Sequence, residues 1–221
     1  MNTNGLLSFG RSFTVTNVAS AGGSSFGTIT SPPIIAPFWD DVNTVQGGQI
    51  FYRQVFDSLI VDQVRQELLS QYPEVGFFFP SLVFVATWDR VAAFSSDFAG
   101  LYNTFQAVIA SDGSRSFVGF NYGNIEWGGP DTLIGVSAGD RFFFITHPAS
   151  LSSSVLNLDG TNVTYRIDGK QSVLLEGVRE GNDTNYYGVK LKVLYEIRTL
   201  AHAGSCCSVI SFESQILNNA Y

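Results

Sequence analysis

Short runs in which apolar and polar residues alternate dominate the first 168 residues, and this period of two predicts β-strands. Residues 82–88 place apolar side chains on both faces, so we expect a central strand covered on each side. Further strands are predicted at residues 35–40, 49–53, 134–137, 142–145 and 163–167, with Gly- and Pro-rich turns between them. The expected fold class is therefore mainly β and β-sandwich-like, built from antiparallel strands and hairpins.

The clearest hairpin joins residues 104–110 to residues 116–122 through Ser111-Asp112-Gly113-Ser114. Asp-Gly between alternating strands predicts a tight turn, because glycine adopts a positive φ at little cost. A first strand is expected at residues 5–9, where the sequence opens as if a domain were already under way. We therefore expect the N-terminal strand of the domain to be truncated, as in a fragment or an incomplete gene model.

One segment follows a helical period instead. Apolar residues recur at intervals of three and four positions, at Phe56, Leu59, Ile60, Val64 and Leu68. This pattern predicts an amphipathic helix over about residues 57–71, with Asp57 or Ser58 as its N-cap and an end before Pro73. Its apolar stripe is wide enough to cover one face of a sheet.

The distribution of charge indicates a domain boundary, and the net charge argues against nucleic acid as a partner. The chain has 12 Lys+Arg against 19 Asp+Glu, a net charge of −7, and this acidity argues against nucleic-acid binding. The negative charge lies within residues 1–168, whereas residues 169–221 are neutral overall. We therefore expect a domain at 1–168 and a separate tail at 169–221, with two candidate strands at 172–175 and 187–195.

Evidence on the compartment points in two directions. The N-terminus has no signal peptide, and the longest apolar stretch, residues 76–88, is interrupted by Pro80, so no membrane insertion by this segment is expected. Asn162 and Asn182 begin N-glycosylation sequons, which carry meaning only in a secreted protein. Cys206 and Cys207 are adjacent and offer no disulfide framework, with two reduced thiols favoured over a strained vicinal disulfide.

Candidates for catalysis are weak. Ser25 and Ser137 each lie in a G-x-S-x-G pattern, but neither pattern is followed by the helix that a nucleophile elbow requires. The two histidines, His147 and His202, have no partner at a recognisable spacing. We expect no catalytic residue and no cofactor, and we keep a serine hydrolase as the alternative.

One polar cluster could hold a metal ion. Asp40, Asp41 and Asn43 follow a predicted strand, Asp89 could add an oxygen, and Ca²⁺ prefers several converging oxygen ligands. The competing interpretation is that these side chains cap turns through backbone hydrogen bonds or pair with Arg90. Because no twelve-residue loop or repeated D-x-D pattern is present, we favour turn capping and expect no metal.

Several blocks of the sequence resemble the NIDO domain of nidogens, alpha-tectorin and certain membrane mucins. The resemblance runs in order over residues 4–168 and is carried by segments 4–10, 35–44, 48–53, 84–91, 103–117, 120–127, 135–140 and 165–168. It implies an extracellular, non-enzymatic domain associated with matrix and cell adhesion, as one module of a larger secreted or membrane-anchored protein. It also implies that Trp39, Trp88 and Trp127 are core anchors and that Asp112-Gly113 is a hairpin turn.

The leading hypothesis is therefore an extracellular adhesion module whose partners are matrix or cell-surface proteins. A domain that only positions its neighbours is a further alternative. Two features depart from the family pattern: the signal peptide and preceding strand are missing, and residues 169–221 do not look like the cysteine-rich modules that usually follow. We interpret that tail as lineage-specific sequence or as a mis-joined gene model.

Overall fold

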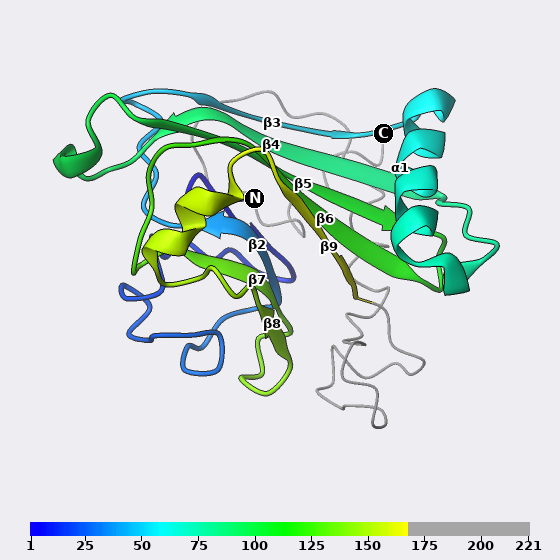
Figure 1. The fold of residues 1–221 in the computed structure, drawn as a ribbon. Helices are drawn as coiled ribbons and strands as arrows, with labels where there is room; N and C mark the ends of the chain where they lie inside the picture. Colours follow the sequence, from blue (N-terminus) through cyan, green and yellow to red (C-terminus); the bar gives the residue numbers. More distant parts are fainter. Residues whose placement is uncertain (168–221) are drawn as a thin grey trace, which may run out of the picture.

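The computed structural model describes residues 1–167, which form two antiparallel sheets packed face to face (Figure 1). The larger sheet has the order β3-β4-β5-β6-β9. Its strands are β3 (Gln49–Gln54), β4 (Leu82–Ala92), β5 (Tyr102–Ser111), β6 (Ser116–Ile125) and β9 (Asn162–Arg166). The smaller sheet has the order β1-β2-β7-β8, from β1 (Leu7–Ser8), β2 (Ile34–Trp39), β7 (Leu133–Ser137) and β8 (Phe144–Thr146). The predicted β-sandwich class is confirmed.

The main core lies between the sheets. Strand β4 sends Phe84, Ala86 and Trp88 into this core, while the alternate residues Val83 and Val85 face the opposite side. This is the arrangement that apolar residues on both faces of a central strand require. The ring of Trp88 stacks on Phe105 of the neighbouring strand, with 5.1 Å between the ring centroids. Phe105 also meets Phe38 of β2 at 5.2 Å between centroids, so aromatic contacts join the two layers.

A second, smaller core lies on the outer side of the β2-β7 sheet. Residues 10–33, which form no strand, fold back over this face and bury Phe13, Phe26 and Ile29 against Trp39. Trp39 is fully buried, and its indole N–H donates to the carbonyl of Val15 at 3.1 Å.

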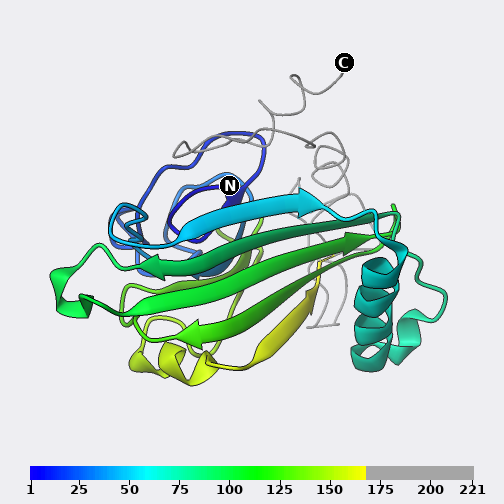
Figure 2. The same cartoon turned by 90° about the horizontal axis from the view of Figure 1, so that it is seen from above.

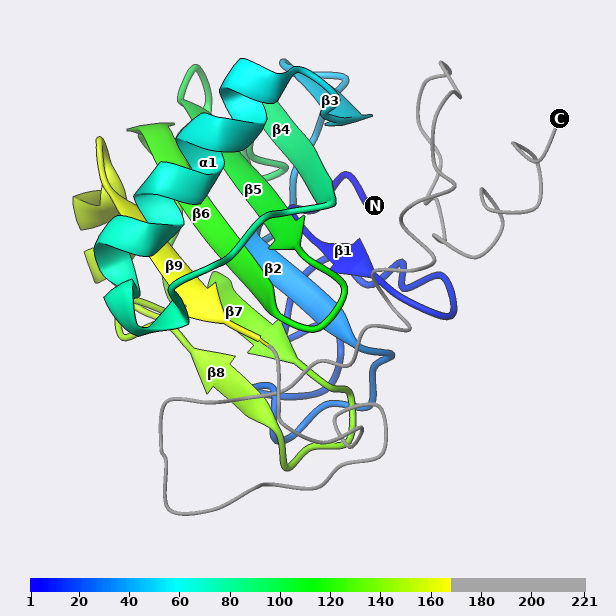
Figure 3. The same ribbon diagram turned by 90° about the vertical axis from the view of Figure 1, so that its right-hand side faces the viewer.

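One helix covers part of the outer face of the larger sheet (Figures 1 and 3). Helix α1 spans Ser58–Gln71, and the Asp57 carboxylate caps it by accepting from the N–H of Leu59. Its inward residues pack on Val83, Ala110 and Phe117. The predicted boundaries and cover are correct, but two residues of the predicted stripe, Phe56 and Leu59, are 76% and 74% exposed. They lie at or before the first turn, beyond the sheet surface that α1 covers.

Three short 3₁₀ helices complete the described elements: η1 (Pro73–Val75), η2 (Ser96–Phe98) and η3 (Ser153–Leu158). In the view of Figure 2, α1 lies at one end of the long strands and η2 at the other. Within residues 1–167, no helix is both long enough and apolar enough to cross a membrane.

Some predicted strand boundaries are wrong. The strand predicted at 142–145 begins only at Phe144, because the Asp140 carboxylate accepts from the N–H groups of Phe142 and Phe143 and holds a turn there. The strand predicted at 5–9 is reduced to β1, since Gly5 has φ +76° and breaks the extended run. The tail strands, together with Asn182, His202, Cys206 and Cys207, lie outside the described residues.

Candidate interaction site

A loop that presents aromatic side chains lies at the end of the larger sheet where α1 sits. Residues 76–81 connect η1 to β4, and Gly76 has the positive φ of +60° that ends η1. The next three residues are phenylalanines with alternating exposure. Phe77 and Phe79 are 86% and 61% exposed, whereas Phe78 is fully buried against Phe117, with ring centroids 5.1 Å apart. We call Phe77 and Phe79 the aromatic pair.

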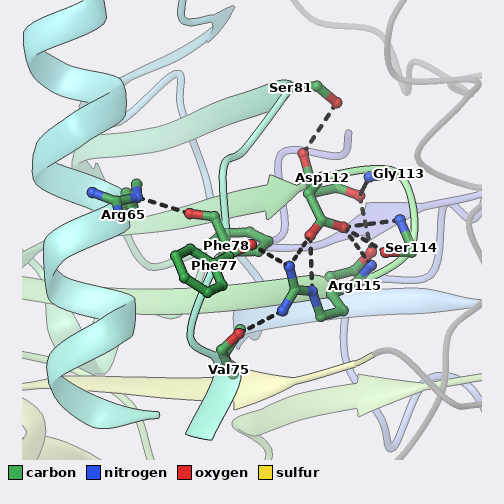
Figure 4. A network of polar contacts seen from close by, with 11 residues as sticks. Arg65, Val75, Phe77, Phe78, Ser81, Asp112, Gly113, Ser114 and Arg115 are labelled. Carbon is green, nitrogen blue, oxygen red and sulfur yellow. Dashed lines mark hydrogen bonds and ion pairs between the residues drawn. The ribbon is translucent and has the colours of Figure 1, made fainter. Parts of the chain in front are cut away.

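Arg115, in the β5–β6 turn, fixes the first half of this loop. Its guanidinium donates to the carbonyl oxygens of Val75 and Phe77 at 2.6 and 2.7 Å (Figure 4). Hydrogen bonds from a charged donor are stronger than those between neutral groups. The residues it joins are about 40 positions apart in the chain, so the loop is tied to the hairpin and not only to its own neighbours.

Asp112 holds Arg115 in place. One carboxylate oxygen accepts from the backbone N–H groups of Ser114 and Arg115, and the other lies 2.6 Å from the Arg115 guanidinium. Partial burial favours the neutral acid, but these hydrogen bonds outweigh it and hold the pKa of Asp112 below its usual value. Gly113 follows with φ +96°, the positive value that the hairpin turn requires.

Arg65, on α1, fixes the second half of the loop. Its side chain donates to the carbonyl of Phe78 at 2.8 Å and lies over the ring of Phe79, 4.5 Å from the centroid. Asp62, one turn earlier on the helix, pairs with it at 3.3 Å. Two arginines from different elements therefore bind three backbone carbonyls, one at the end of η1 and two in the loop, and the aromatic pair projects from this support.

Two of the residues considered as calcium ligands, Asp40 and Asn43, make turn and loop contacts with their side-chain oxygens. One oxygen of Asp40 accepts from the hydroxyl of Thr132 at 2.6 Å, and the other accepts from the N–H of Asp41 at 2.8 Å. Asn43 caps the next turn by accepting from the N–H groups of Val45 and Gln46. Burial raises the pKa of both Asp40 and Asp41, because the charged form of each carboxyl loses hydration.

The alternative pairing with Arg90 is not formed: among the described residues, no ion pair joins Arg90 to these aspartates. Arg90 turns toward Tyr102, with its guanidinium 5.6 Å from the ring centroid. Across residues 1–167, no group of three His, Cys, Asp or Glu side chains is placed to hold a metal ion.

Among residues 1–167, the contacts of the two serines of the alternative hypothesis are turn contacts. Ser137 is buried in β7, and its hydroxyl accepts from the N–H of Gly139 in the following turn. Ser25 lies in a turn in which its N–H donates to the hydroxyl of Thr28. Nδ1 of His147 accepts from the N–H of Ala149, and within the described part of the chain neither serine hydrogen-bonds to a histidine.

The remaining candidates are structural or exposed. Trp88 and Trp127 are buried in the main core, and their indole N–H groups donate to backbone carbonyls, of Asn2 and Thr3 for Trp88 and of Val91 for Trp127. Asn162 is exposed at the start of β9.

Sequence reasoning missed the aromatic pair and both arginines. It identified residues 76–88 only as an apolar stretch too short for a membrane. A usable signal is present, because three phenylalanines stand between Gly76 and Pro80 and a proline marks them as outside the strand. Nothing local identifies Arg65 and Arg115 as the residues that hold them.

Comparison with known sequences identifies relatives of this chain. The family model described as the nidogen-like domain (NIDO) matches residues 1–172. Alpha-tectorin of Mus musculus is 30% identical over 192 residues, which cover 77% of this chain and 9% of that protein. Nidogen-1 of Mus musculus is 36% identical over 102 residues, covering 42% and 8%. Mucin-4 of Homo sapiens is 31% identical over 123 residues, covering 50% and 2%.

This chain therefore spans less than a tenth of the length of each of these relatives. No solved structure matches it. Nidogen-like domains occur in extracellular matrix proteins such as nidogen and tectorin, and nothing in these similarities supports a serine hydrolase. Because the family model covers most of the sequence and the resemblance seen in the residues is confirmed, this chain belongs to the nidogen-like domain family.

Proposed function

We propose that this chain is a non-enzymatic extracellular module, within residues 1–168, that binds a matrix or cell-surface protein through the aromatic pair. The observation that carries the proposal is the exposure of Phe77 and Phe79 on a loop held by Arg65 and Arg115. Exposed phenylalanines are costly to leave in water, and a rigid support lowers the entropy lost when they are buried by a partner.

Interfaces between proteins favour such anchors. Aromatic residues are enriched at the centre of interfaces, and a few of them carry most of the binding energy. The partner is expected to offer an apolar pocket rather than a basic or acidic surface, because each arginine beside the aromatic pair is already paired with an aspartate. Family membership supports the extracellular compartment of the proposal, since nidogen-like domains occur in extracellular matrix proteins.

The experiment is direct binding to native matrix. The full chain, expressed in mammalian cells behind an added signal peptide, would be purified from the medium and titrated onto the cell-free matrix deposited by cultured fibroblasts. We expect saturable binding that unlabelled chain displaces and that an albumin-coated surface does not show. A folded, secreted chain that shows no saturable binding would contradict the proposal and favour a domain that only positions its neighbours.

A further inference from the structure

The outer face of the larger sheet is divided into two halves. Helix α1 covers the half that carries Val83, Ala110 and Phe117. The other half carries polar side chains in register across the strands: Thr87 of β4, Gln106 of β5, Asn121 of β6 and Asn162 of β9. We call these four residues the polar row.

Three members of the polar row are joined by hydrogen bonds. The amide of Asn121 donates to Gln106 at 3.1 Å, and the amide of Gln106 donates to the hydroxyl of Thr87 at 2.8 Å. Asn162 is different, because it is exposed and its side chain has no hydrogen-bond partner among the described residues. It is therefore free to carry a substituent without breaking the row.

Asn162 also meets the sequence and geometric requirements of a modification site. Asn162-Val163-Thr164 is a sequon. Because side chains alternate along a strand, Asn162 and Thr164 share the outer face, while Val163 packs on the core. Among the described strands, β9 is at the edge of its sheet and pairs only with β6, so a bulky group there faces a neighbouring strand on one side only.

We propose that Asn162 carries an N-linked glycan whose stem lies over the polar row and leaves the aromatic pair uncovered. Hydroxyl-rich sugars suit the amide and hydroxyl groups of this row better than an apolar partner does. Helix α1 lies between the polar row and the aromatic pair. A groove of about 240 Å³ between α1 and the sheet is lined in part by Gln106, Asn121 and Thr164. The row and the turn that holds Arg115 are separated by roughly 16 Å along β6.

This inference deepens the proposed function and rests on it, because only a chain that enters the secretory pathway meets the glycosylation machinery. Its consequence is that modification and partner binding use separate surfaces: the polar row across the middle of the larger sheet, and the loop at the end of that sheet where α1 sits. The glycan would direct partners toward the aromatic pair by excluding them from the polar row.

The first test is site-specific mass spectrometry on the full chain secreted from mammalian cells behind an added signal peptide. Enzymatic removal of N-glycans converts a modified asparagine to aspartate, and we expect this conversion at Asn162. Asn162→Gln and Thr164→Val should each remove that glycan, whereas Thr164→Ser, which keeps the sequon, should retain it. An unmodified Asn162 in secreted chain would overturn the inference while leaving the matrix-binding result on the same material intact.

The second test concerns coverage. In a chain with Cys206 and Cys207 replaced by serine, Asn121→Cys and Phe77→Cys would be labelled separately with a bulky maleimide. Removing the glycan should speed labelling at position 121 and leave the rate at position 77 unchanged. Equal rates at position 121 before and after glycan removal would contradict coverage of the polar row.

Discussion

At the scale of single residues, Asp112 links the turn chemistry of the hairpin to the loop that presents the aromatic pair. Its side chain is only 11% exposed, and it both closes the turn and orients Arg115. A carboxylate whose pKa is lowered by folding stabilises the folded state above its unfolded pKa, and this contribution is lost as the pH falls through the folded pKa. Asp112 therefore makes stability depend on pH in the acid range.

Asp112→Asn is expected to lower the free energy of unfolding by about 1.5–3 kcal/mol at pH 7, since it removes a charged hydrogen-bond acceptor. The difference from the unsubstituted chain should shrink as the pH falls below about 4, the usual pKa of an unfolded aspartate, and on through the lower pKa of folded Asp112. Urea unfolding at several pH values would measure this. Asp62→Asn is the matched control, because Asp62 is 61% exposed in a similar pair with Arg65, and its effect should stay below about 1 kcal/mol. A loss at Asp112 that is independent of pH would contradict the account.

Substitution of two glycines by alanine should distinguish the cost of backbone strain alone from the cost of a steric clash. Gly113 has φ +96°, and a methyl group added there would have nothing within 4 Å, so Gly113→Ala meets only backbone strain, about 1–3 kcal/mol. Gly135 has φ +145°, and an added Cβ would lie 1.9 Å from the carbonyl oxygen of Ile145 in β8. Gly135→Ala should therefore cost clearly more and detach β8, which chemical denaturation and amide exchange at β7 and β8 would reveal. If Gly113→Ala and Gly135→Ala lowered the free energy of unfolding equally, β7 and β8 would pack less closely than this contact requires.

At the scale of elements, the loop at residues 76–81 carries three consecutive phenylalanines, of which the middle one is buried and the other two are exposed. Phe78→Ala should cost about 3–5 kcal/mol, because a fully buried ring is removed. Phe77→Ala and Phe79→Ala should each change the free energy of unfolding by less than about 1 kcal/mol, with the cation–π contact to Arg65 making Phe79 the larger of the two. Thermal and urea unfolding of the three variants would test this order. A large loss in the free energy of unfolding of Phe77→Ala would mean that Phe77 is part of the core.

The elements themselves could largely be predicted from sequence, because their signals are local. The three- and four-residue spacing and Asp57 located α1, and period-two alternation located β4, β5 and β6. The exposure of Phe56 and Leu59 could not be predicted, since it depends on where the sheet surface ends. The support of the aromatic pair could not be predicted either, because Arg115 meets Val75 across 40 positions and no local pattern encodes that contact.

At the scale of the whole molecule, the larger sheet carries two different surfaces, one at the end beside α1 and one across its outer face. One end carries the aromatic pair beside α1, and the polar row with Asn162 crosses the part of the outer face that α1 leaves open. The resemblance to nidogen-like domains is visible in the residues and holds over residues 1–172. The surface through which such a domain binds is not visible there, because it depends on packing rather than on a motif.

The central claim is that the aromatic pair binds a matrix or cell-surface protein, and its most direct test compares two variants in the matrix-binding titration. The double variant Phe77→Ala/Phe79→Ala should weaken binding at least about tenfold, which corresponds to roughly 1.4 kcal/mol. Phe142→Ala is the matched control, since Phe142 is 81% exposed on a different loop, and its Kd should stay unchanged. Both variants should keep the unfolding midpoint of the unsubstituted chain within a few degrees. Unchanged binding by the folded double variant, or an equal loss with Phe142→Ala, would contradict the account.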